Sequence, residues 1–270
     1  MPTNDDMDWK AMLEGTHPEY RRFRQFFRRL PSSPRCKMCY APFVGPGAPF
    51  MRMIGRARLP NNPNYCTICM KWIESNRGGA EVVISLLFAD VRGSTTLGEL
   101  LTPSDFSALL NRFYSVAADS VIEHDGIVDK FVGDEIMAIF AVPYAGENHA
   151  GQAIAAARAL IRATADIEVG GHRVPVGAGV HTGVAFVGAV GGEGSKADFT
   201  ALGDTVNTTA RLASAAAAGE VLVTVAAASA AGLAFDGAER RSLELRGRAE
   251  AVDVIVLREG VAAAAAGAAS

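Results

Sequence analysis

Apolar and polar positions alternate regularly along the chain from about residue 81 onward. Val82–Asp90 is an apolar run that ends at a polar turn, which predicts a buried strand. A helix is predicted to begin at Pro103, because Thr102 can cap it and Asp105 lies in its first turn. The apolar stripe of this helix comprises Phe106, Leu109, Leu110, Phe113 and Ala117.

Two strands joined by Gly133-Asp134 follow this helix and predict a hairpin over residues 126–140, with Asp134 in its tip. An alanine-rich helix is predicted over Glu147–Ala165. The remaining predicted elements are strands over Val174–Gly183 and Val184–Val190, a strand reaching Leu202, a helix from Asp204 to Ala215, and strands over Glu220–Val223, Leu243–Leu245 and Val252–Leu257. The order strand, helix, two strands, helix, strand predicts a ferredoxin-like α+β domain.

Composition and charge divide the chain into two parts. Its 270 residues are 49% hydrophobic and 20% charged, which excludes a wholly disordered, collagen-like or coiled-coil chain. The net charge of −3 gives no indication of nucleic-acid or membrane binding. However, residues 1–80 carry 13 basic and 6 acidic side chains, whereas residues 81–270 carry 13 and 23. We therefore expect an N-terminal module over residues 1–78, a main domain over 79–258 and a disordered alanine-rich tail over 259–270.

Four cysteines in the N-terminal module form two CxxC pairs, Cys36 with Cys39 and Cys66 with Cys69. Two such pairs can complete a tetrahedral four-thiolate site around zinc. The loop between the pairs is rich in proline and glycine and predicts no core of its own, so an ordered module needs a metal. Structural zinc is the favoured interpretation. An iron–sulfur cluster, or disulfides and free thiols, are the alternatives.

A basic amphipathic helix is predicted over His17–Leu30, with Phe23, Phe26 and Phe27 on one face. This face either packs on the metal site or on a partner protomer, or the helix contacts nucleic acid or an anionic membrane. The sequence does not separate these alternatives.

Neither a signal peptide nor a transmembrane segment is predicted. The first ten residues are acidic and lack an apolar run. The stretch Val221–Phe235 is shorter than the roughly 20 residues that a membrane-spanning helix needs. We therefore expect a cytoplasmic protein.

Candidate chemistry in the main domain begins with two carboxylates. Asp90 follows a buried strand and Asp134 interrupts a hairpin, positions at which an aspartate is usually a turn residue. Together they could bind Mg²⁺ through oxygen atoms, which suits phosphate chemistry. Asn207 and Arg211 lie four residues apart on a predicted helix, so both project from one face and can act on a single ligand.

Four segments in this order resemble the signature blocks of class III nucleotidyl cyclases. They are FADVRGST at 88–95, DKFVGDEIMAIF at 129–140, GVHTG at 179–183 with VG at 187–188, and DFTALGDTVN at 198–207 followed by ARL at 210–212. The resemblance extends from residue 81 to about residue 257. Four ordered blocks are far more specific than a single glycine motif.

The resemblance implies a class III cyclase catalytic domain, and it assigns roles to individual residues. Asp90 and Asp134 match the metal-binding aspartates, with the Val91 carbonyl as a further ligand, for two Mg²⁺ or Mn²⁺ ions per site. Lys130 and Thr200 match the pair that selects adenine, which implies ATP as the substrate. Asn207 matches the residue that orients the ribose, and Arg211 the one that stabilises charge on the α-phosphoryl group. Arg248, or alternatively Arg246, matches the basic segment that contacts the terminal phosphates.

The resemblance further implies a homodimer in which each active site is shared between two protomers. The expected reaction is attack of the ribose 3′-hydroxyl of ATP on the α-phosphorus, giving cyclic AMP and pyrophosphate. A guanylyl cyclase is disfavoured by Lys130 and Thr200. The alternative outside this class is a weak nucleotide-binding dimer whose zinc module binds nucleic acid or a protein.

Overall fold

A computed structural model of the chain describes residues 4–30, 34–36, 38–59, 65–75, 78–191, 198–234, 237–245 and 250–259. The chain forms two compact units. The first comprises Met1–Ile84, Ala141–Glu147 and Val184–Gly203, and the second Ser85–Phe140, Asn148–Gly183 and Asp204–Ser270. The tail predicted to be disordered lies, from residue 260 on, outside the described residues.

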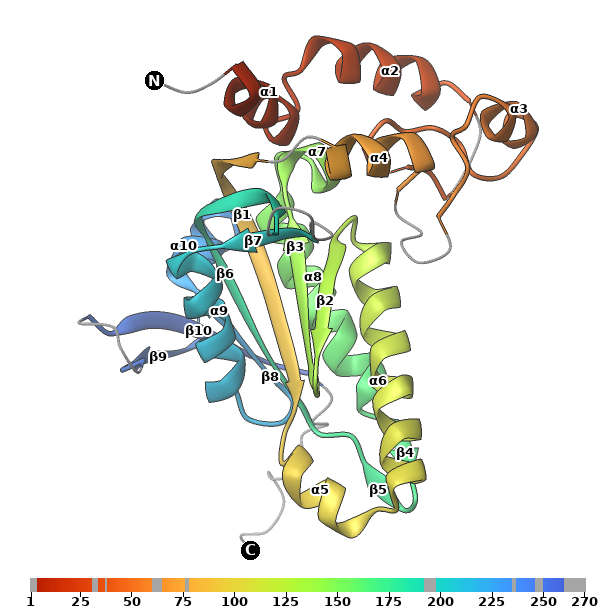
Figure 1. Cartoon of the computed structure of the whole chain (residues 1–270). Coiled ribbons are helices and arrows are strands. Elements are labelled where there is room, and N and C mark those ends of the chain that lie inside the picture. Colours follow the sequence, from red (N-terminus) through yellow and green to blue (C-terminus); the bar gives the residue numbers. More distant parts are fainter. Residues whose placement is uncertain are drawn as a thin grey trace, which may run out of the picture. The chain divides into compact units, whose positions relative to one another are not determined.

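Four helices precede the first described strand, and strands and helices then follow one another singly or in short groups (Figure 1). The helices are α1 (Asn4–Leu13), α2 (Pro18–Arg28), α3 (Ala48–Met53), α4 (Thr67–Ser75), α5 (Ser94–Leu100), α6 (Pro103–Glu123), α7 (Val142–Ala145), α8 (His149–Thr164), α9 (Asp204–Ala215) and α10 (Val225–Ala230). The strands are β1 (Gly78–Val91), β2 (Ile127–Val132), β3 (Glu135–Phe140), β4 (Glu168–Val169), β5 (His172–Arg173), β6 (Val176–Val190), β7 (Asp198–Leu202), β8 (Glu220–Thr224), β9 (Glu239–Leu243) and β10 (Val252–Arg258).

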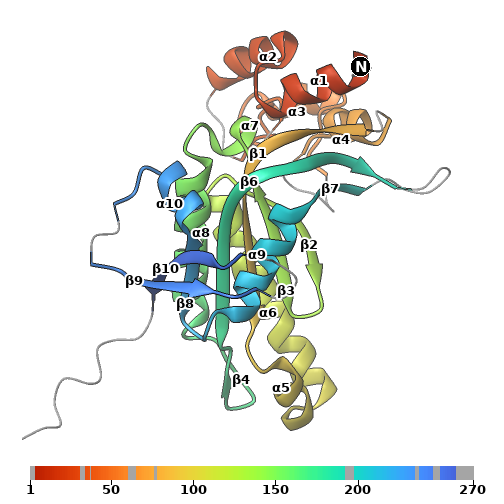
Figure 2. The ribbon, with the colours of Figure 1, turned by 90° about the vertical axis from the view of Figure 1, so that its left-hand side faces the viewer.

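Eight of the described strands form one mixed sheet, with the strand order β2-β3-β1-β6-β8-β10-β9 and with β7 paired to β6, whereas β4 and β5 pair with each other in a separate sheet. Strands β1 and β3 are antiparallel, whereas β6 and β8 are parallel. Figure 2 shows α8 and α9 on either side of β6. The predicted α+β fold class is confirmed.

The core of the second unit forms where the sequence predicts it. Leu109, Phe113 and Ala117 of α6 are fully buried, and α6 packs along α8. The predicted cap is present, because the Thr102 side chain accepts a hydrogen bond from the Asp105 backbone N–H at 3.2 Å. The apolar stripe on one face of α6 therefore predicts which side of the helix faces the core.

The sequence predicts two strands over Val174–Val190, and this prediction is wrong, because β6 is continuous. At Gly183, where the sequence predicts the end of the first strand, the missing side chain instead allows α9 to pack closely on β6. A Cβ atom at this position would lie 2.8 Å from the Thr205 hydroxyl oxygen of α9. Gly179 has the same role, since its Cβ would lie 2.6 Å from the Ala213 backbone nitrogen. Glycine in this strand thus indicates close approach of a helix.

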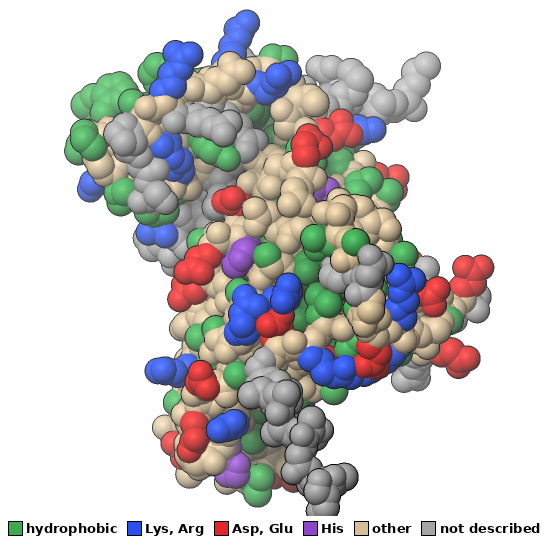
Figure 3. Space-filling view, turned by 180° about the vertical axis from the view of Figure 1, so that it is seen from behind, with side chains coloured by type: hydrophobic (Ala, Val, Ile, Leu, Met, Phe, Trp, Pro, Cys, Tyr) green, Lys and Arg blue, Asp and Glu red, His purple; other side chains and the backbone are tan. Residues whose placement is uncertain are grey.

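In the first unit, an aromatic group packs around α1. The Trp9 ring lies 5.0 Å from that of Trp72 and 6.2 Å from that of Phe199, measured between centroids. Figure 3 shows hydrophobic and basic side chains together on the surface of the part that carries α2 and α3. The most exposed apolar side chains there are Phe26, Phe50 and Met53.

An ionic network joins the strands at one edge of the second unit. Glu220 of β8 is buried, and its carboxylate accepts hydrogen bonds from Arg241 of β9 at 2.7 and 3.0 Å and from Arg258 of β10 at 3.0 Å. The bond from Arg241 holds the pKa of Glu220 below its usual range. Each strand at this edge is therefore tied to the next by side chains as well as by its backbone.

We predict that Glu220→Gln lowers the free energy of unfolding at pH 7 by about 2 kcal/mol, because the variant loses charged hydrogen bonds in a buried position. Because the pKa of Glu220 is lower in the folded than in the unfolded chain, its ionised form stabilises the fold at any pH above the ordinary carboxyl pKa of about 4.3. This stabilisation is lost as the pH falls through the pKa of the folded state. Urea denaturation should therefore show a constant difference near neutral pH that shrinks in acid. Glu239→Gln is the control, because Glu239 bonds the same arginines from an exposed position. An equal effect of both variants would contradict the prediction.

Candidate active site

The pairing of β1 with β3 brings two predicted site residues to one place. In the antiparallel register Asp90 lies opposite Glu135, the residue that follows Asp134. The Val91 backbone N–H donates a hydrogen bond to the Asp134 carbonyl oxygen at 3.1 Å. The end of β1 and the tip of the β2–β3 hairpin are thereby joined, so Asp90, Val91 and Asp134 form one group.

The hairpin tip that carries Asp134 is held from two directions. Gly133 has a φ of 61°, a left-handed conformation that favours glycine in the tight turn. The Tyr114 hydroxyl of α6 donates a hydrogen bond to the Gly133 carbonyl oxygen. The Tyr114 ring also lies 4.5 Å from the Phe131 ring of β2. Asp134 is therefore fixed by its neighbours rather than by bonds of its own side chain.

Arg92 links Asp90 to α9. Its guanidinium forms an ion pair with the Asp90 carboxylate and donates a hydrogen bond to the Ser214 carbonyl oxygen at 2.7 Å. The Arg92 backbone N–H donates to the Pro175 carbonyl oxygen at 2.6 Å. The oxygen in this ion pair is Oδ1, and Asp90 is buried. A buried carboxylate needs a cationic partner, which Arg92 supplies here, and carboxylate oxygens also suit a divalent cation.

Negative charge accumulates at this end of the sheet. Burial and the neighbouring Asp134 raise the pKa of Glu135 to about 7. Burial also raises the pKa of Tyr114, with a smaller contribution from Asp134. Arg92 is the basic side chain that offsets part of this charge, and burial lowers its pKa. Such a set of oxygen atoms around one arginine can hold divalent cations of the Mg²⁺ or Mn²⁺ type.

The other predicted site residues that the structure describes lie on β2, β7 and α9. Lys130 is exposed on β2, with its Nζ 3.6 Å from an oxygen of Asp129. Thr200 is buried on β7 in the first unit. Asn207 is exposed and Arg211 half-buried on α9, and neither side chain has a polar partner among the described residues. Arg248, together with its alternative Arg246, lies outside the described residues.

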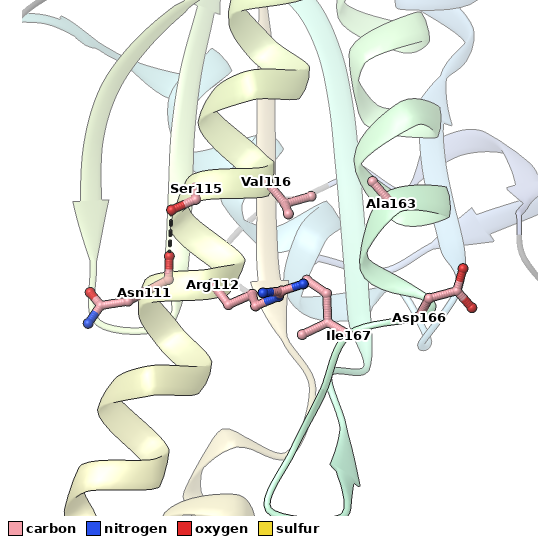
Figure 4. Close-up of a pocket in the computed structure, with 7 residues that line it drawn as sticks. All are labelled: Asn111, Arg112, Ser115, Val116, Ala163, Asp166 and Ile167. Carbon is pink, nitrogen blue, oxygen red and sulfur yellow. Dashed lines mark hydrogen bonds between the residues drawn. The ribbon is translucent and has the colours of Figure 1, made fainter.

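A pocket of about 460 Å³ lies at α6 and the C-terminal end of α8 (Figure 4). Asn111, Arg112, Ser115, Val116, Ala163, Asp166 and Ile167 line it. In Figure 4 the Ser115 hydroxyl points to the Asn111 carbonyl oxygen, with which it bonds at 2.9 Å, so this group serves the helix itself. The lining includes none of the residues that the sequence predicts for the site, and we assign it no role.

The four cysteines of the first unit lie together and are buried. Their sulfur atoms all lie within 4.8 Å of one another, and the Sγ atoms of Cys39 and Cys66 are 3.8 Å apart. This arrangement could hold a metal ion. The prediction that the two CxxC pairs meet is therefore confirmed, whereas the identity of the metal stays a prediction.

Sequence reasoning missed three side chains of the site: Arg92, Glu135 and Tyr114. Arg92 reads as a turn residue, and only the fold shows its bond to α9. Glu135 follows Asp134 directly, so cross-strand pairing with Asp90 could have indicated it once the hairpin register was known. Nothing in the sequence marks Tyr114 as a site residue beyond its position on a predicted helix.

Comparison with known proteins agrees with this geometry. Residues 80–258 match the family model described as the adenylate and guanylate cyclase catalytic domain. An uncharacterized protein of Mycobacterium tuberculosis is 36% identical over 162 residues, which are 58% of this chain and 29% of that protein. Adenylate cyclase 1 of Rhizobium meliloti is 32% identical over 151 residues, which are 53% of this chain and 23% of that protein. The chain thus spans less than a third of the length of these relatives.

Solved structures with the same fold include cyclases of both specificities. The guanylyl cyclase Cya2 matches with a TM-score of 0.58 and 27% identity, covering 66% of this chain and 93% of that one. The adenylyl cyclase CyaB of P. aeruginosa matches with a TM-score of 0.56 and 26% identity, covering 66% of this chain and 95% of that one. Within the part of the chain that the structure describes, no helix has the length and apolar character needed to cross a bilayer.

Proposed function

The chain belongs to the family of adenylate and guanylate cyclase catalytic domains, and on this premise we propose that it is an adenylyl cyclase that converts ATP to 3′,5′-cyclic AMP and pyrophosphate. The observation that carries the proposal is the joining of Asp90 and Asp134 at one end of the sheet, where Arg92 pairs with the Asp90 carboxylate. The backbone needs neither side chain there, so a divalent cation could bind both carboxylates, in the case of Asp90 beside or in place of the Arg92 guanidinium.

Asp90, Asp134 and the Val91 carbonyl would hold two divalent cations. These are hard oxygen donors, which Mg²⁺ and Mn²⁺ prefer over nitrogen or sulfur. When bound, the cations would neutralise phosphate charge and lower the pKa of the ribose 3′-hydroxyl. Arg92 and Tyr114 would hold the two aspartates in position from either side.

Selection of adenine is assigned to Lys130 and Thr200, as the resemblance implies. A lysine ammonium can donate to a ring nitrogen of adenine, and a threonine hydroxyl can accept from its exocyclic amine. Guanine offers the opposite donor and acceptor pattern at these atoms. ATP is therefore the substrate that this pair favours.

In the reaction, a bond forms between the 3′-oxygen and the α-phosphorus while the bond from that phosphorus to the pyrophosphate oxygen breaks. The hydroxyl proton passes to Asp90 or to solvent. Asn207 would orient the ribose, and Arg211 would stabilise the charge that develops on the α-phosphoryl oxygens. Arg248 or Arg246 would contact the terminal phosphates.

The active site is proposed to be shared across a homodimer. Asn207 and Arg211 project from α9 with no polar partner among the described residues of their own chain. This supports an assignment in which Asp90 and Asp134 form one half of each site, and Asn207 and Arg211 of the other protomer form the second half. A twofold dimer would then contain two equivalent sites.

The cysteine cluster is proposed to be a metal site that scaffolds or regulates the cyclase domain. The sequence favours structural zinc over an iron–sulfur cluster. The loop between the two cysteine pairs is rich in proline and glycine, so a bound metal would contribute directly to the folding of this region.

The direct test is product analysis with purified protein, ATP or GTP, and Mg²⁺ or Mn²⁺. We expect cyclic AMP from ATP, and we expect Asp90→Asn and Asp134→Asn to lower the rate at least about 100-fold, because each removes a charged metal ligand. Asp119→Asn is the matched control, because Asp119 is an exposed aspartate of α6. Cyclic AMP formation that survives both site variants would refute the assignment of these residues.

Substrate preference tests the second half of the proposal. The double variant Lys130→Glu with Thr200→Cys should lower kcat/KM for ATP by about 100-fold or more and raise it for GTP, since hydrogen-bonding groups that are mispaired with a bound base reject that base. Thr200 is buried, and cysteine is close to threonine in size, so the fold should be kept. Circular dichroism checks folding. An unchanged ratio of ATP to GTP turnover in the folded double variant would overturn the adenine assignment.

A further inference from the structure

The spacing of the four thiols distinguishes one metal ion from a cluster. Around a single ion with metal–sulfur bonds of about 2.3 Å, the sulfur atoms of a tetrahedron stand about 3.8 Å apart. The Sγ atoms of Cys39 and Cys66 are 3.8 Å apart, and no pair in the group exceeds 4.8 Å. The cage formed by the four sulfur atoms therefore has the dimensions of a mononuclear site.

An iron–sulfur cluster needs a wider arrangement of cysteines. In a cluster the four cysteines are divided among two or more iron atoms, which bridging sulfides hold apart. Thiolates on different irons are therefore separated by more than the edge of a tetrahedron around one ion. The four buried sulfur atoms leave no room for several irons and sulfides between them at their present spacing.

The sulfur atoms also have hydrogen-bond donors around them. The Cys66 backbone N–H donates to Sγ of Cys36 at 3.3 Å. Nη1 of Arg56 donates to Sγ of Cys39 at 3.2 Å and lies 3.9 Å from Sγ of Cys66. Four thiolates around a divalent ion carry two net negative charges, and the Arg56 guanidinium compensates one of them. Such outer partners orient the ligands and strengthen metal binding.

Arg56 also connects the cysteines to α2. Its guanidinium carbon lies 5.2 Å from the centre of the Phe23 ring and 5.9 Å from that of Phe27, within the range of cation–π contacts. Phe27 is buried, whereas Phe23 remains partly exposed. One guanidinium thus contacts the cysteine sulfurs and two aromatic rings of α2.

A second arginine ties the end of α2 to the first cysteine pair. Arg35, which precedes Cys36, donates from Nη1 to the Phe27 carbonyl oxygen at 2.6 Å and from Nη2 to the Leu30 carbonyl oxygen. The Phe27 carbonyl lies in the last turn of α2 and Leu30 follows the C-cap Arg29, so Arg35 binds at the C-terminal end of the helix, where a basic side chain is favourable. Both arginines therefore link the position of α2 to the geometry of the cysteine pairs.

From these contacts we infer that the four cysteines bind a single Zn²⁺ ion in a tetrahedral site, and that Arg56 couples occupancy of this site to the seating of α2. The inference rests on the proposed metal-binding role of the cysteines and is independent of the cyclase assignment. Zn²⁺ is the ion that suits a closed, buried four-thiolate cage without open positions.

Metal analysis of the 270-residue chain tests the identity of the ion. Protein expressed with both zinc and iron in the medium and purified without oxygen should contain one zinc per chain and no acid-labile sulfide. Iron in place of zinc, or sulfide with two or more irons, would overturn the inference but leave a metal-binding module. A chain without any bound metal would refute the metal-binding role itself.

The Arg56→Gln variant tests the coupling, with Arg52→Gln as the control because Arg52 is an exposed arginine close by on α3. We expect Arg56→Gln to lower zinc affinity about 10–100-fold in competition with a chelator. With Co²⁺ in place of zinc, its sulfur-to-cobalt absorption bands should shift, because a hydrogen bond to the thiolates is lost.

Hydrogen exchange of residues 18–28 measures the link to α2 in the same variants. Exchange should accelerate when zinc is removed from the unmodified chain, and also in zinc-loaded Arg56→Gln. The zinc-loaded Arg52→Gln control should match the unmodified chain. Equal protection of α2 in the presence and absence of zinc would overturn the coupling, whatever the metal analysis shows.

Discussion

The candidate active site depends on the antiparallel register between β1 and β3. This register sets Asp90 opposite Glu135 and lets Val91 bond the Asp134 carbonyl. Side chains alternate between the two faces of a strand, so a shift of one residue would turn Asp90 to the opposite face and separate it from Asp134. The buried residues on both sides of Asp90, Ala89 and Val91, fix this register. The hydrophobic core therefore positions the carboxylates.

Residues around Asp90 and Asp134 compensate part of their negative charge and fix their positions. Arg92 offsets the charge of Asp90 and reaches α9, and Tyr114 braces the hairpin turn from α6. The two aspartates are thus connected to α9 through Arg92 and to α6 through the hairpin turn. In the N-terminal region, arginines connect the basic helix α2 to the cysteine pairs, which a proposed metal ion joins to each other.

Much of the fold could be predicted because periodicity and caps are local signals. The α6 stripe, the β2–β3 hairpin and the Asp134 turn follow from residues within one element. The continuity of β6 could not be predicted, because Gly183 reads as a break while its real role depends on Thr205 of a later helix. Short helices such as α3 and α5 have too few residues for a periodic pattern.

The candidate site was predictable to a similar extent. Asp90, Asp134 and the four cysteines carry motif signals of fixed spacing. Arg92 and Arg56 act through contacts that exist only after folding, and Glu135 could be recognised only from the register of β1 with β3. Asn207 and Arg211 are a different case. Their spacing predicts one shared face, but the ligand on that face is proposed to lie against a second copy of the chain.

Complementation between two inactive variants tests the central claim, a cyclase site divided between protomers, most directly. Asp90→Asn and Arg211→Ala chains with different tags would be co-expressed, and the heterodimer isolated through both tags. One of its two sites would be intact, so its rate of cyclic AMP formation should be about half that of the unmodified dimer. A heterodimer of Asp90→Asn with Asp134→Asn, whose changes lie in the same half, should stay inactive. An inactive first pair, or an active second pair, would contradict the account.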